Sequence, residues 1–417
     1  MGRGPCLAGG NRPRAVKSGK PDNLTPATRL VQAGRAPEWT GPVVNPPVWR
    51  GSTHLYQNCA DLARGRADRD GEFYYGRRGA PTQWALAQAL TEMEPGAAGT
   101  VLYPSGVSAI TASVMAVLRA GDVLLVSDNA YEPSRAMARN LLADCGIETR
   151  FFDPLDLAGF PARFCERTRA VLLESPGSLT MEVCDVPALA AMARTRGAVS
   201  LIDNTWATPL GFPALERGVD ITIMSLTKHI GGHSDLMMGS ATAGAELYAK
   251  LRAKAQALGL VVSPDDAALA LRGLRTMGLR LERGAASARA VAGWLRTRPE
   301  VAQVLCPLLE GAPGHDLWAR DFTGGCGLFS FVLKGRTPAH RAALIDALKL
   351  FGIGYSWGGF ESLVIPFDPQ RARSETRWPP NGWNPEDRLG VRLSIGLEDA
   401  GDLIADLEAA FAAMDSE

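Results

Sequence analysis

The chain has 417 residues, of which 46% are hydrophobic and 21% are charged. This length exceeds what one hydrophobic core usually serves, so we expect a globular protein of two domains. The 44 Lys and Arg residues balance the 44 Asp and Glu residues, which excludes a global basic field for nucleic acid and the acidic excess of a disordered chain. The seven cysteines contain no C-x-x-C pair, a pattern typical of free thiols in the reducing cytoplasm.

The N-terminal stretch predicts an arm rather than a domain. Residues 1–20 hold five basic residues and no acid, but they lack the apolar core of a secretory signal. We interpret them as a disordered extension or as sequence that precedes the true start. Residues 1–50 are rich in Gly, Pro and Arg and predict irregular structure. We therefore predict an N-terminal extension and arm over residues 1–78. No apolar stretch of the chain is long enough to cross a bilayer, so we expect no membrane partner.

From about residue 82 the hydrophobic pattern alternates between the period of a helix and that of a strand. Strands that alternate with helices imply a mainly parallel sheet with helices on both faces, so this pattern predicts an α/β domain over 79–274. The predicted helices are 83–93, 107–119, 134–145 and 186–194, and the predicted strands are 100–103, 122–127, 148–152, 170–173, 199–203 and 220–225.

After residues 239–243 the composition becomes helical, and the last part mixes strands with helices. This pattern predicts a smaller α+β domain over 275–417, attached by a long helix. The predicted helices are 265–276, 281–297, 339–350 and 398–413, and the predicted strands are 301–304, 327–333, 362–365 and 390–395.

A lysine and an aspartate follow two of the predicted strands. Strand 220–225 leads through Thr227 into Lys228, and strand 199–203 ends in Asp203. Because the carboxyl ends of parallel strands share one edge of a sheet, we expect this amine and this carboxylate on one crevice. Pyridoxal phosphate needs a lysine for its Schiff base, an acid for its pyridine nitrogen and donors for its phosphate. A lone lysine after a strand is usually a surface residue, so the interpretation depends on the combination.

Two Gly-containing segments suit an anion. Ser105-Gly-Val-Ser108 lies where a predicted strand meets a predicted helix, so free backbone N–H groups would point at one spot. An ordinary turn is the alternative. Arg77 and Arg78, in a loop flanked by glycines, could form a fork for phosphate or carboxylate, or they could be a solvated charge pair.

An aromatic residue and a buried cation complete the candidates. Tyr131 follows strand 122–127, where its ring could stack on a heteroaromatic ring and its phenol could exchange a proton, or where it could plug the sheet edge. Arg392 lies inside an apolar strand and needs a partner. The α-carboxylate of an amino acid and the nearby acids Glu398 and Asp399 suit it equally.

The sequence speaks against a metal or nucleotide site. His229 and His233 are four residues apart, but the glutamate of a zinc helix is missing and two glycines between them oppose a helix. No P-loop lysine motif and no G-x-G-x-x-G after a strand occurs. We therefore predict no metal.

Seven stretches of the sequence, together with the candidate residues above, resemble the Cys/Met-metabolism family of fold-type I pyridoxal phosphate enzymes. The resemblance runs from about Tyr74 to the C-terminus. The resemblance implies a mainly parallel sheet flanked by helices, a smaller C-terminal α+β domain and an extended N-terminal arm. The stretches that carry it are Tyr74-Tyr-Gly-Arg-Arg-Gly-Ala-Pro-Thr82, Asn129-Ala-Tyr-Glu-Pro-Ser134, Leu173-Glu-Ser-Pro-Gly-Ser-Leu-Thr-Met-Glu182, Ile202-Asp-Asn-Thr-Trp206, Thr227-Lys-His-Ile-Gly-Gly-His-Ser-Asp235, Tyr355-Ser-Trp-Gly-Gly-Phe-Glu-Ser362 and Arg392-Leu-Ser-Ile-Gly-Leu-Glu-Asp399.

The resemblance implies a role for each candidate residue and a homotetramer built as a dimer of dimers. Lys228 would carry the cofactor and, with Tyr131, act as a catalytic group. Tyr131 would also stack on the cofactor ring, and Asp203 would pair with its pyridine nitrogen. The implied phosphate ligands are Gly106, Val107, Ser225 and Thr227, with Tyr75 and Arg77 from a neighbouring subunit, and the implied ligands of the substrate α-carboxylate are Ser356, Trp357 and Arg392.

Within the family, the chain is most similar to the β-lyases that cleave cystathionine to homocysteine, pyruvate and ammonia in methionine biosynthesis, and that also accept other cysteine S-conjugates. Many γ-acting relatives have Asn-Pro where this chain has Ser178-Leu179, which favours β-elimination. A γ-lyase or γ-synthase type of enzyme on the same scaffold is an alternative, and a non-catalytic protein that keeps the fold is another.

Overall fold

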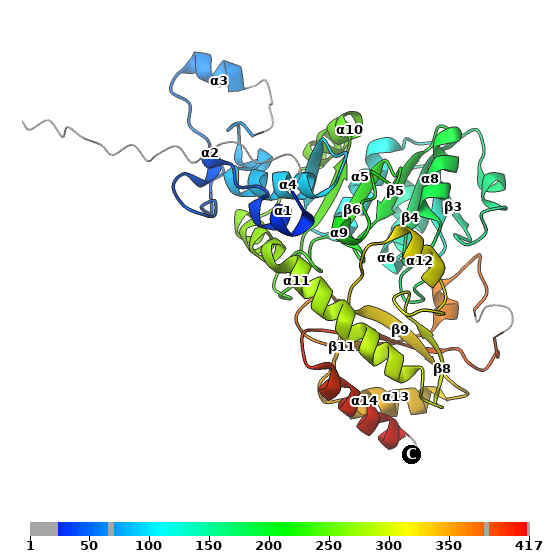
Figure 1. The fold of residues 1–417 in the computed structure, drawn as a ribbon. Coiled ribbons are helices and arrows are strands. Elements are labelled where there is room, and N and C mark those ends of the chain that lie inside the picture. Colours follow the sequence, from blue (N-terminus) through cyan, green and yellow to red (C-terminus); the bar gives the residue numbers. More distant parts are fainter. Residues whose placement is uncertain (1–23, 66–70, 379–382, 415–417) are drawn as a thin grey trace, which may run out of the picture.

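The computed structural model describes residues 24–65, 71–378 and 383–414, which form two sheets joined by a long helix (Figure 1). The larger sheet has the strand order β1-β7-β6-β5-β4-β2-β3. Strands β2 to β6 are parallel to one another, whereas β7 is antiparallel to both of its neighbours. The strands are β1 Gly99–Tyr103, β2 Val123–Ser127, β3 Glu148–Phe152, β4 Thr168–Glu174, β5 Val199–Asp203, β6 Ile221–Ser225 and β7 Gly239–Ala243.

Helices cover both faces of this sheet (Figure 1). The strand β2 shows why, because Val123 and Leu125 belong to one buried core cluster while Leu124 and Val126 belong to the other. A strand that is apolar on both faces requires a layer on each side. The helices are α4 Pro81–Met93, α5 Gly106–Val117, α6 Glu132–Arg139, α7 Leu141–Asp144, α8 Val186–Thr195, α9 Thr208–Gly211 and α10 Ala245–Ala257, with the 3₁₀ turns Gly76–Arg78 and Phe160–Arg163.

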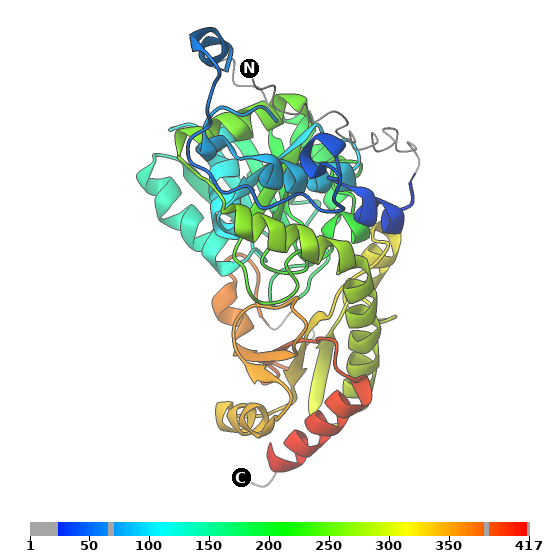
Figure 2. The same ribbon diagram turned by 90° about the vertical axis from the view of Figure 1, so that its left-hand side faces the viewer.

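The smaller sheet has the order β10-β11-β12-β9-β8. The 32-residue helix α11, Pro264–Leu295, packs on α4 beside the larger sheet and extends along the smaller sheet to the C-terminal helix α14, Ala400–Met414 (Figure 2). The remaining elements are β8 Val301–Leu305, α12 His315–Asp321, β9 Leu328–Leu333, α13 Pro338–Ala347, β10 Gly352–Ile353, β11 Leu363–Phe367, the 3₁₀ turn Pro369–Ala372, β12 Leu389–Ser394 and α14 Ala400–Met414.

The predicted α/β fold class is confirmed, and several element predictions are corrected. The strand β7 was not predicted, because its small residues Gly-Ser-Ala-Thr-Ala lack the branched apolar pattern of a buried strand. The predicted helix 134–145 is two helices, α6 and α7, and the predicted helices 265–276 and 281–297 are one helix, α11. The predicted domain boundaries at 78/79 and 274/275 stay predictions, and the second falls inside α11.

The prediction of irregular structure over 1–50 is wrong for two short helices, α1 Pro26–Gln32 and α2 Pro37–Thr40. Each begins with proline, whose fixed φ suits the first helical position. Arg275 of α11 holds the end of α1 by donating hydrogen bonds to the carbonyls of Leu30 and Ala33. The extension 1–20 lies outside the described residues, as does part of the arm. Within the described ranges, no helix combines the length and apolar composition that a bilayer crossing requires.

Candidate active site

A cavity of about 280 Å³ lies where the carboxyl ends of β5 and β6 face the smaller sheet. All predicted site residues except Tyr75 and Arg77 line it. The residues that line the cavity are Ser105, Gly106, Val107, Ile110, Tyr131, Glu174, Pro176, Gly177, Ser178, Leu179, Asp203, Thr205, Trp206, Ser225, Thr227, Lys228, Met237, Leu328, Tyr355, Ser356, Trp357 and Arg392.

Lys228 is fixed by the tight turn that follows β6 and by α11. Its N–H donates to the carbonyl of Ser225 at 3.2 Å, and Arg280 of α11 donates to the carbonyl of His229 at 2.8 Å. Gly273 of α11 allows this turn to lie against the helix, because a Cβ there would come within 2.2 Å of the carbonyl oxygen of Ile230. The lysine therefore enters the cavity from a rigid base.

The amine of Lys228 is held in an environment that favours its neutral form. Its Nζ donates to Ser356 Oγ at 2.7 Å and lies 5.3 Å from the centre of the Trp357 ring. Burial, and next the positive charge of Arg392, lower the pKa of Lys228 to about 8, against the opposing effect of Asp203. A lysine with such a pKa is a usable nucleophile and base near neutral pH.

This lowered pKa predicts how protein stripped of cofactor reacts with an amine reagent such as acetic anhydride. Only the neutral amine reacts, so labelling of the Lys228 peptide should rise with pH, reach half of its maximum near the pKa of about 8, and level off about one pH unit above it. Lys250, which is exposed and pairs with Glu246, serves as the internal reference. Lys228 labelling that continues to rise through pH 10 would contradict the assignment.

Asp203 presents one free carboxylate oxygen at the end of β5. Its Oδ1 accepts hydrogen bonds from the N–H and the hydroxyl of Thr205, whereas Oδ2 accepts none within the described part of the chain. Burial raises the pKa of Asp203, although the Thr205 donors and Lys228 oppose the rise. The hydroxyl of Thr205 also accepts from the N–H of Ser225 at 2.8 Å, which ties the ends of β5 and β6 together.

The start of α5 forms an anion cradle against the end of β6. The N–H groups of Gly106 and Val107 belong to the first helical turn and have no helical acceptor, and Ser105 caps the helix through Ser108. A Cβ on Gly106 would come within 2.7 Å of the Ser225 Cβ, so only glycine lets the two segments approach. This geometry suits a phosphate at a helix N-terminus better than an ordinary turn.

The two predicted hydroxyl ligands of the phosphate differ in their environment. The hydroxyl of Ser225 makes no hydrogen bond within the described residues, and it borders the N-terminus of α5. The hydroxyl of Thr227 donates to the Met238 carbonyl at 3.2 Å and accepts from the Met238 N–H at 3.0 Å. Ser225 is thus the more available donor.

Arg392 of β12 is buried without a carboxylate partner among the described residues. Its only hydrogen bond there is from Nη2 to the carbonyl of Ser356, at 3.1 Å. The predicted alternative partners are engaged elsewhere: Glu398 accepts from the N–H and the hydroxyl of Ser362, and Asp399 lies 3.9 Å from Arg283. Burial lowers the pKa of Arg392 to about 10, which still leaves it charged at neutral pH. A buried cation in this state suits an anionic ligand.

Ser356 links the lysine to this arginine. Its hydroxyl accepts from Lys228 and its carbonyl accepts from Arg392, and its backbone φ is +88°. A serine in this region costs of order 1–3 kcal/mol, a strain that is characteristic of binding sites.

Tyr131 lies at the mouth of the cavity, with 43% of its surface exposed. Its N–H donates to Glu174 Oε2 at 2.6 Å. Burial, and next the charge of Glu174, raise the pKa of the Tyr131 phenol, so it stays protonated at neutral pH. Because the ring is not packed into the sheet, Tyr131 does not merely plug its edge.

Glu174 and Thr205 are site residues that the sequence analysis missed. Glu174 ends β4, and burial followed by the charge of Asp203 raises its pKa well above the ordinary value. Its position at the carboxyl end of a parallel strand, inside the stretch Leu173–Glu182, was the signal that could have identified it.

Across the described residues, no group of three or more His, Cys, Asp or Glu is placed to hold a metal ion.

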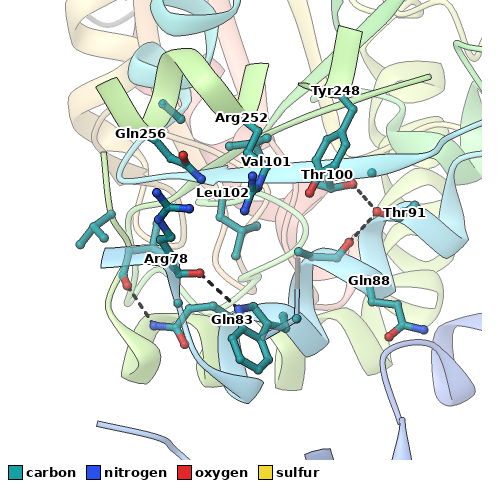
Figure 3. A pocket seen from close by; sticks show the side chains of 18 of the residues that line it. Arg78, Gln83, Gln88, Thr91, Thr100, Val101, Leu102, Tyr248, Arg252 and Gln256 are labelled. Carbon is teal, nitrogen blue, oxygen red and sulfur yellow. Dashed lines mark hydrogen bonds between the residues drawn. The ribbon is translucent and has the colours of Figure 1, made fainter. Parts of the chain in front are cut away.

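Tyr75 and Arg77 lie away from this cavity in the single chain. Tyr75 is 45% exposed, and Arg77 donates to the carbonyl of Gln256 at 3.2 Å. Arg77 lines a different cavity of about 360 Å³ between α4, β1 and α10, which Gln83, Tyr248 and Arg252 also line (Figure 3). These two residues therefore complete no phosphate site within their own chain.

The comparisons with known proteins agree with this site. The family model described as "Cys/Met metabolism PLP-dependent enzyme" matches residues 27–412. The chain is 45% identical over 392 residues to a putative cystathionine beta-lyase of Rhizobium johnstonii, covering 93% of this chain and 96% of that protein. It is 43% identical over 389 residues to the cystathionine beta-lyase MetC of Escherichia coli, covering 92% and 98%.

Among solved structures, cystathionine gamma synthase from Xanthomonas oryzae in complex with cystathionine superposes with a TM-score of 0.85 at 34% identity, covering 94% of this chain and 99% of that chain. The fold and the cavity thus define a pyridoxal phosphate enzyme. The chain belongs to the family of Cys/Met metabolism PLP-dependent enzymes, and its cofactor is pyridoxal 5'-phosphate.

Proposed function

We propose that this chain is a carbon–sulfur β-lyase that cleaves the Cβ–S bond of L-cystathionine and, with the uptake of one water molecule, yields homocysteine, pyruvate and ammonia. The observation that carries the proposal is one cavity that holds a lysine with a pKa of about 8, a carboxylate with a free oxygen and a buried arginine without a carboxylate partner among the described residues. The relatives named cystathionine beta-lyase support this choice of substrate.

Each side chain has a separate task in the proposed site. Pyridoxal phosphate, when bound, supplies the electron sink for the bond that breaks at the substrate's Cα. Asp203 would hold the pyridine nitrogen protonated through its free Oδ2, and Tyr131 would stack on the ring. The N–H groups of Gly106 and Val107, with the hydroxyl of Ser225 and the turn at Thr227, would hold the phosphate.

Proton transfer falls to Lys228. In its neutral form its amine takes the proton from the substrate's Cα, and Lys228 or the protonated Tyr131 returns a proton to the leaving sulfur. Arg392 would bind the α-carboxylate through two parallel N–H groups, with the backbone of Ser356 and Trp357 beside it. These contacts fix the Cα–H bond relative to the amine, so positioning contributes to the rate.

A γ-acting enzyme is the second candidate, because the superposed Xanthomonas oryzae structure is named a cystathionine gamma synthase. The wall of the cavity at Ser178 and Leu179, where many γ-acting relatives have Asn-Pro, favours the β-lyase. Incubation with cystathionine separates the two. The β-lyase releases pyruvate and homocysteine, whereas 2-oxobutyrate and cysteine as the main products would contradict the proposal.

We infer that Tyr75 and Arg77 act in a neighbouring subunit, as the family resemblance implies, and that the enzyme is a homotetramer built from two dimers. If so, a mixture of Arg77→Ala and Lys228→Ala chains should regain activity, because each hybrid dimer contains one complete site. Random assortment predicts about a quarter of the wild-type activity. A mixture that remains as inactive as the separate variants, although the chains exchange, would contradict the shared site.

We also propose where the enzyme is located and which other substrates it cleaves. The six cysteines of the described residues are all free, as in a reducing cytoplasm, where we place the enzyme. Other cysteine S-conjugates carry the same α-amino and α-carboxylate groups as cystathionine, and we propose that they are cleaved more slowly.

A further inference from the structure

One segment of the smaller sheet is attached to the loops that form the cavity wall on the larger sheet. It is residues 368–378, which follow β11 on the way to β12 and are drawn in orange in Figure 1. Residues 373–376 of this connection contact Asp128, Arg135 and Glu182, and we call this set of residues the clasp. Its two sides are about 190 to 250 residues apart in the sequence, since the contacts span separations from 191 to 248.

Asp128 is the centre of the clasp. It follows β2 and is fully buried, and its carboxylate accepts the N–H groups of Ser374, Glu375 and Thr376 at 2.9 to 3.0 Å. The hydroxyls of Ser374 and Thr376 also donate to it, at 2.7 and 3.1 Å. A carboxylate that accepts so many donors in a buried site is bound firmly, because each charge-assisted bond is stronger than a neutral one.

Two arginines complete the clasp. Arg135 of α6 is fully buried and donates to Asp128 Oδ1 at 2.8 Å and to Ser374 Oγ at 3.0 Å. Nη2 of Arg373 donates to both carboxylate oxygens of Glu182, at 2.9 Å each. Burial on its own would raise the pKa of Asp128, but the bonds from Ser374 and Arg135 keep it below its ordinary value, so the carboxylate is charged.

The clasp is continuous with the wall of the active site. Asp128 lies three residues before Tyr131, and the carbonyl of the intervening Asn129 accepts the N–H of Ser178 at 2.9 Å. Glu182 closes the loop that carries Ser178, because its carbonyl accepts the N–H of Gly177 at 2.8 Å. Tyr131 and Ser178 line the cavity from one sheet, and Arg392 lines it from the other.

We propose that Asp128 is a positioning residue for the reaction: by anchoring residues 373–376 of the smaller sheet's connection, it sets where Tyr131 and the Ser178 loop stand relative to Arg392. Asp128 itself touches neither substrate nor cofactor in this account. Its effect on turnover rests on the proposed function, whereas its effect on the two loops is a property of the chain alone.

The test compares Asp128→Asn with Asp122→Asn. The amide of the first variant turns an NH₂ group toward N–H donors and removes the charge that faces Arg135, which breaks the clasp. Asp122 lies before the other end of β2, where its side-chain carboxylate accepts, among the described residues, only the N–H of Arg119, so its change is the matched control. The double variant Ser374→Ala/Thr376→Ala removes two donors and keeps the Asp128–Arg135 pair, in case Asp128→Asn does not fold.

Hydrogen exchange on protein without cofactor is the first readout. We expect the amides of 374–376 to exchange faster in Asp128→Asn and in the double variant, and those of Tyr131 and of residues 177–182 to exchange faster as well. Faster exchange confined to 374–376 would overturn the proposal, because the clasp would then be a local attachment.

Turnover by the loaded enzyme is the second readout. A displacement of Tyr131 by about 1 Å should lower kcat by about 10²-fold, whereas KM should change by less than about threefold, because Arg392 is untouched. The control should match the wild type in both. A kcat equal to the wild type in a variant with broken clasp contacts would overturn the proposal. If the wild-type chain itself shows no lyase activity, the proposed function fails, and the exchange data still decide the clasp.

Discussion

Replacing Lys228 with alanine should abolish turnover while the protein keeps its fold and still binds the cofactor. Among the described residues, Lys228 is the only lysine that lines the cavity, and its amine has the lowered pKa that a base needs. Loss of both the nucleophile and the base predicts a fall in kcat of at least about 10⁴-fold. The proposed phosphate ligands Gly106, Val107 and Ser225 remain, so we expect cofactor absorption in the purified variant.

Two controls make the result specific to the amine. Lys250→Ala removes an exposed lysine of α10 that pairs with Glu246 and lines no part of the cavity, so its kinetics should match the wild type. Small primary amines added to Lys228→Ala should restore part of the rate, because the substitution leaves space in the cavity. Wild-type turnover by Lys228→Ala would refute the site.

Replacing Arg392 with leucine should lower kcat/KM by about 10²- to 10³-fold, chiefly through KM, because it removes a buried cation that would pair with the substrate carboxylate. The kcat/KM of Arg392→Lys should lie between that of the wild type and that of Arg392→Leu, since an ammonium keeps the charge but not the two parallel N–H donors. Arg283→Leu changes an exposed arginine of α11 and is the control.

The same variant makes a second, independent prediction. The charge of Arg392 lowers the pKa of Lys228, so its removal should raise that pKa from about 8 toward the ordinary lysine value. The pH profile of amine labelling should shift upward in Arg392→Leu and stay in place in Arg283→Leu. An unchanged profile together with an unchanged KM would show that Arg392 faces neither the lysine nor the substrate.

The hydrophobic pattern predicted the alternating helices and strands well where strands are rich in branched residues. It missed β7, whose small side chains are all buried, and it divided α11 into two predicted helices, 265–276 and 281–297. The local hydrophobic pattern predicts neither the strand β7 nor the continuity of α11, because both depend on tertiary contacts.

Residue type and strand position together predicted that Lys228 and Asp203 share one crevice, and both residues line the same cavity. The partner of Arg392 could not be decided from sequence, because acids near it in the chain competed with a ligand. In the structure Glu398 accepts hydrogen bonds from Ser362 and makes none with Arg392, and an anionic ligand of Arg392 stays our proposal. The clasp joins Asp128 to Ser374 across 246 residues, a separation at which no sequence pattern predicts contact.

The central claim is that Lys228 carries the cofactor, and borohydride reduction tests it most directly. Reduction of the enzyme with bound pyridoxal phosphate, followed by digestion and peptide mapping, should place the cofactor-derived label on the peptide that contains Lys228. A label on another lysine, or no stable label on a protein that shows cofactor absorption, would contradict the account.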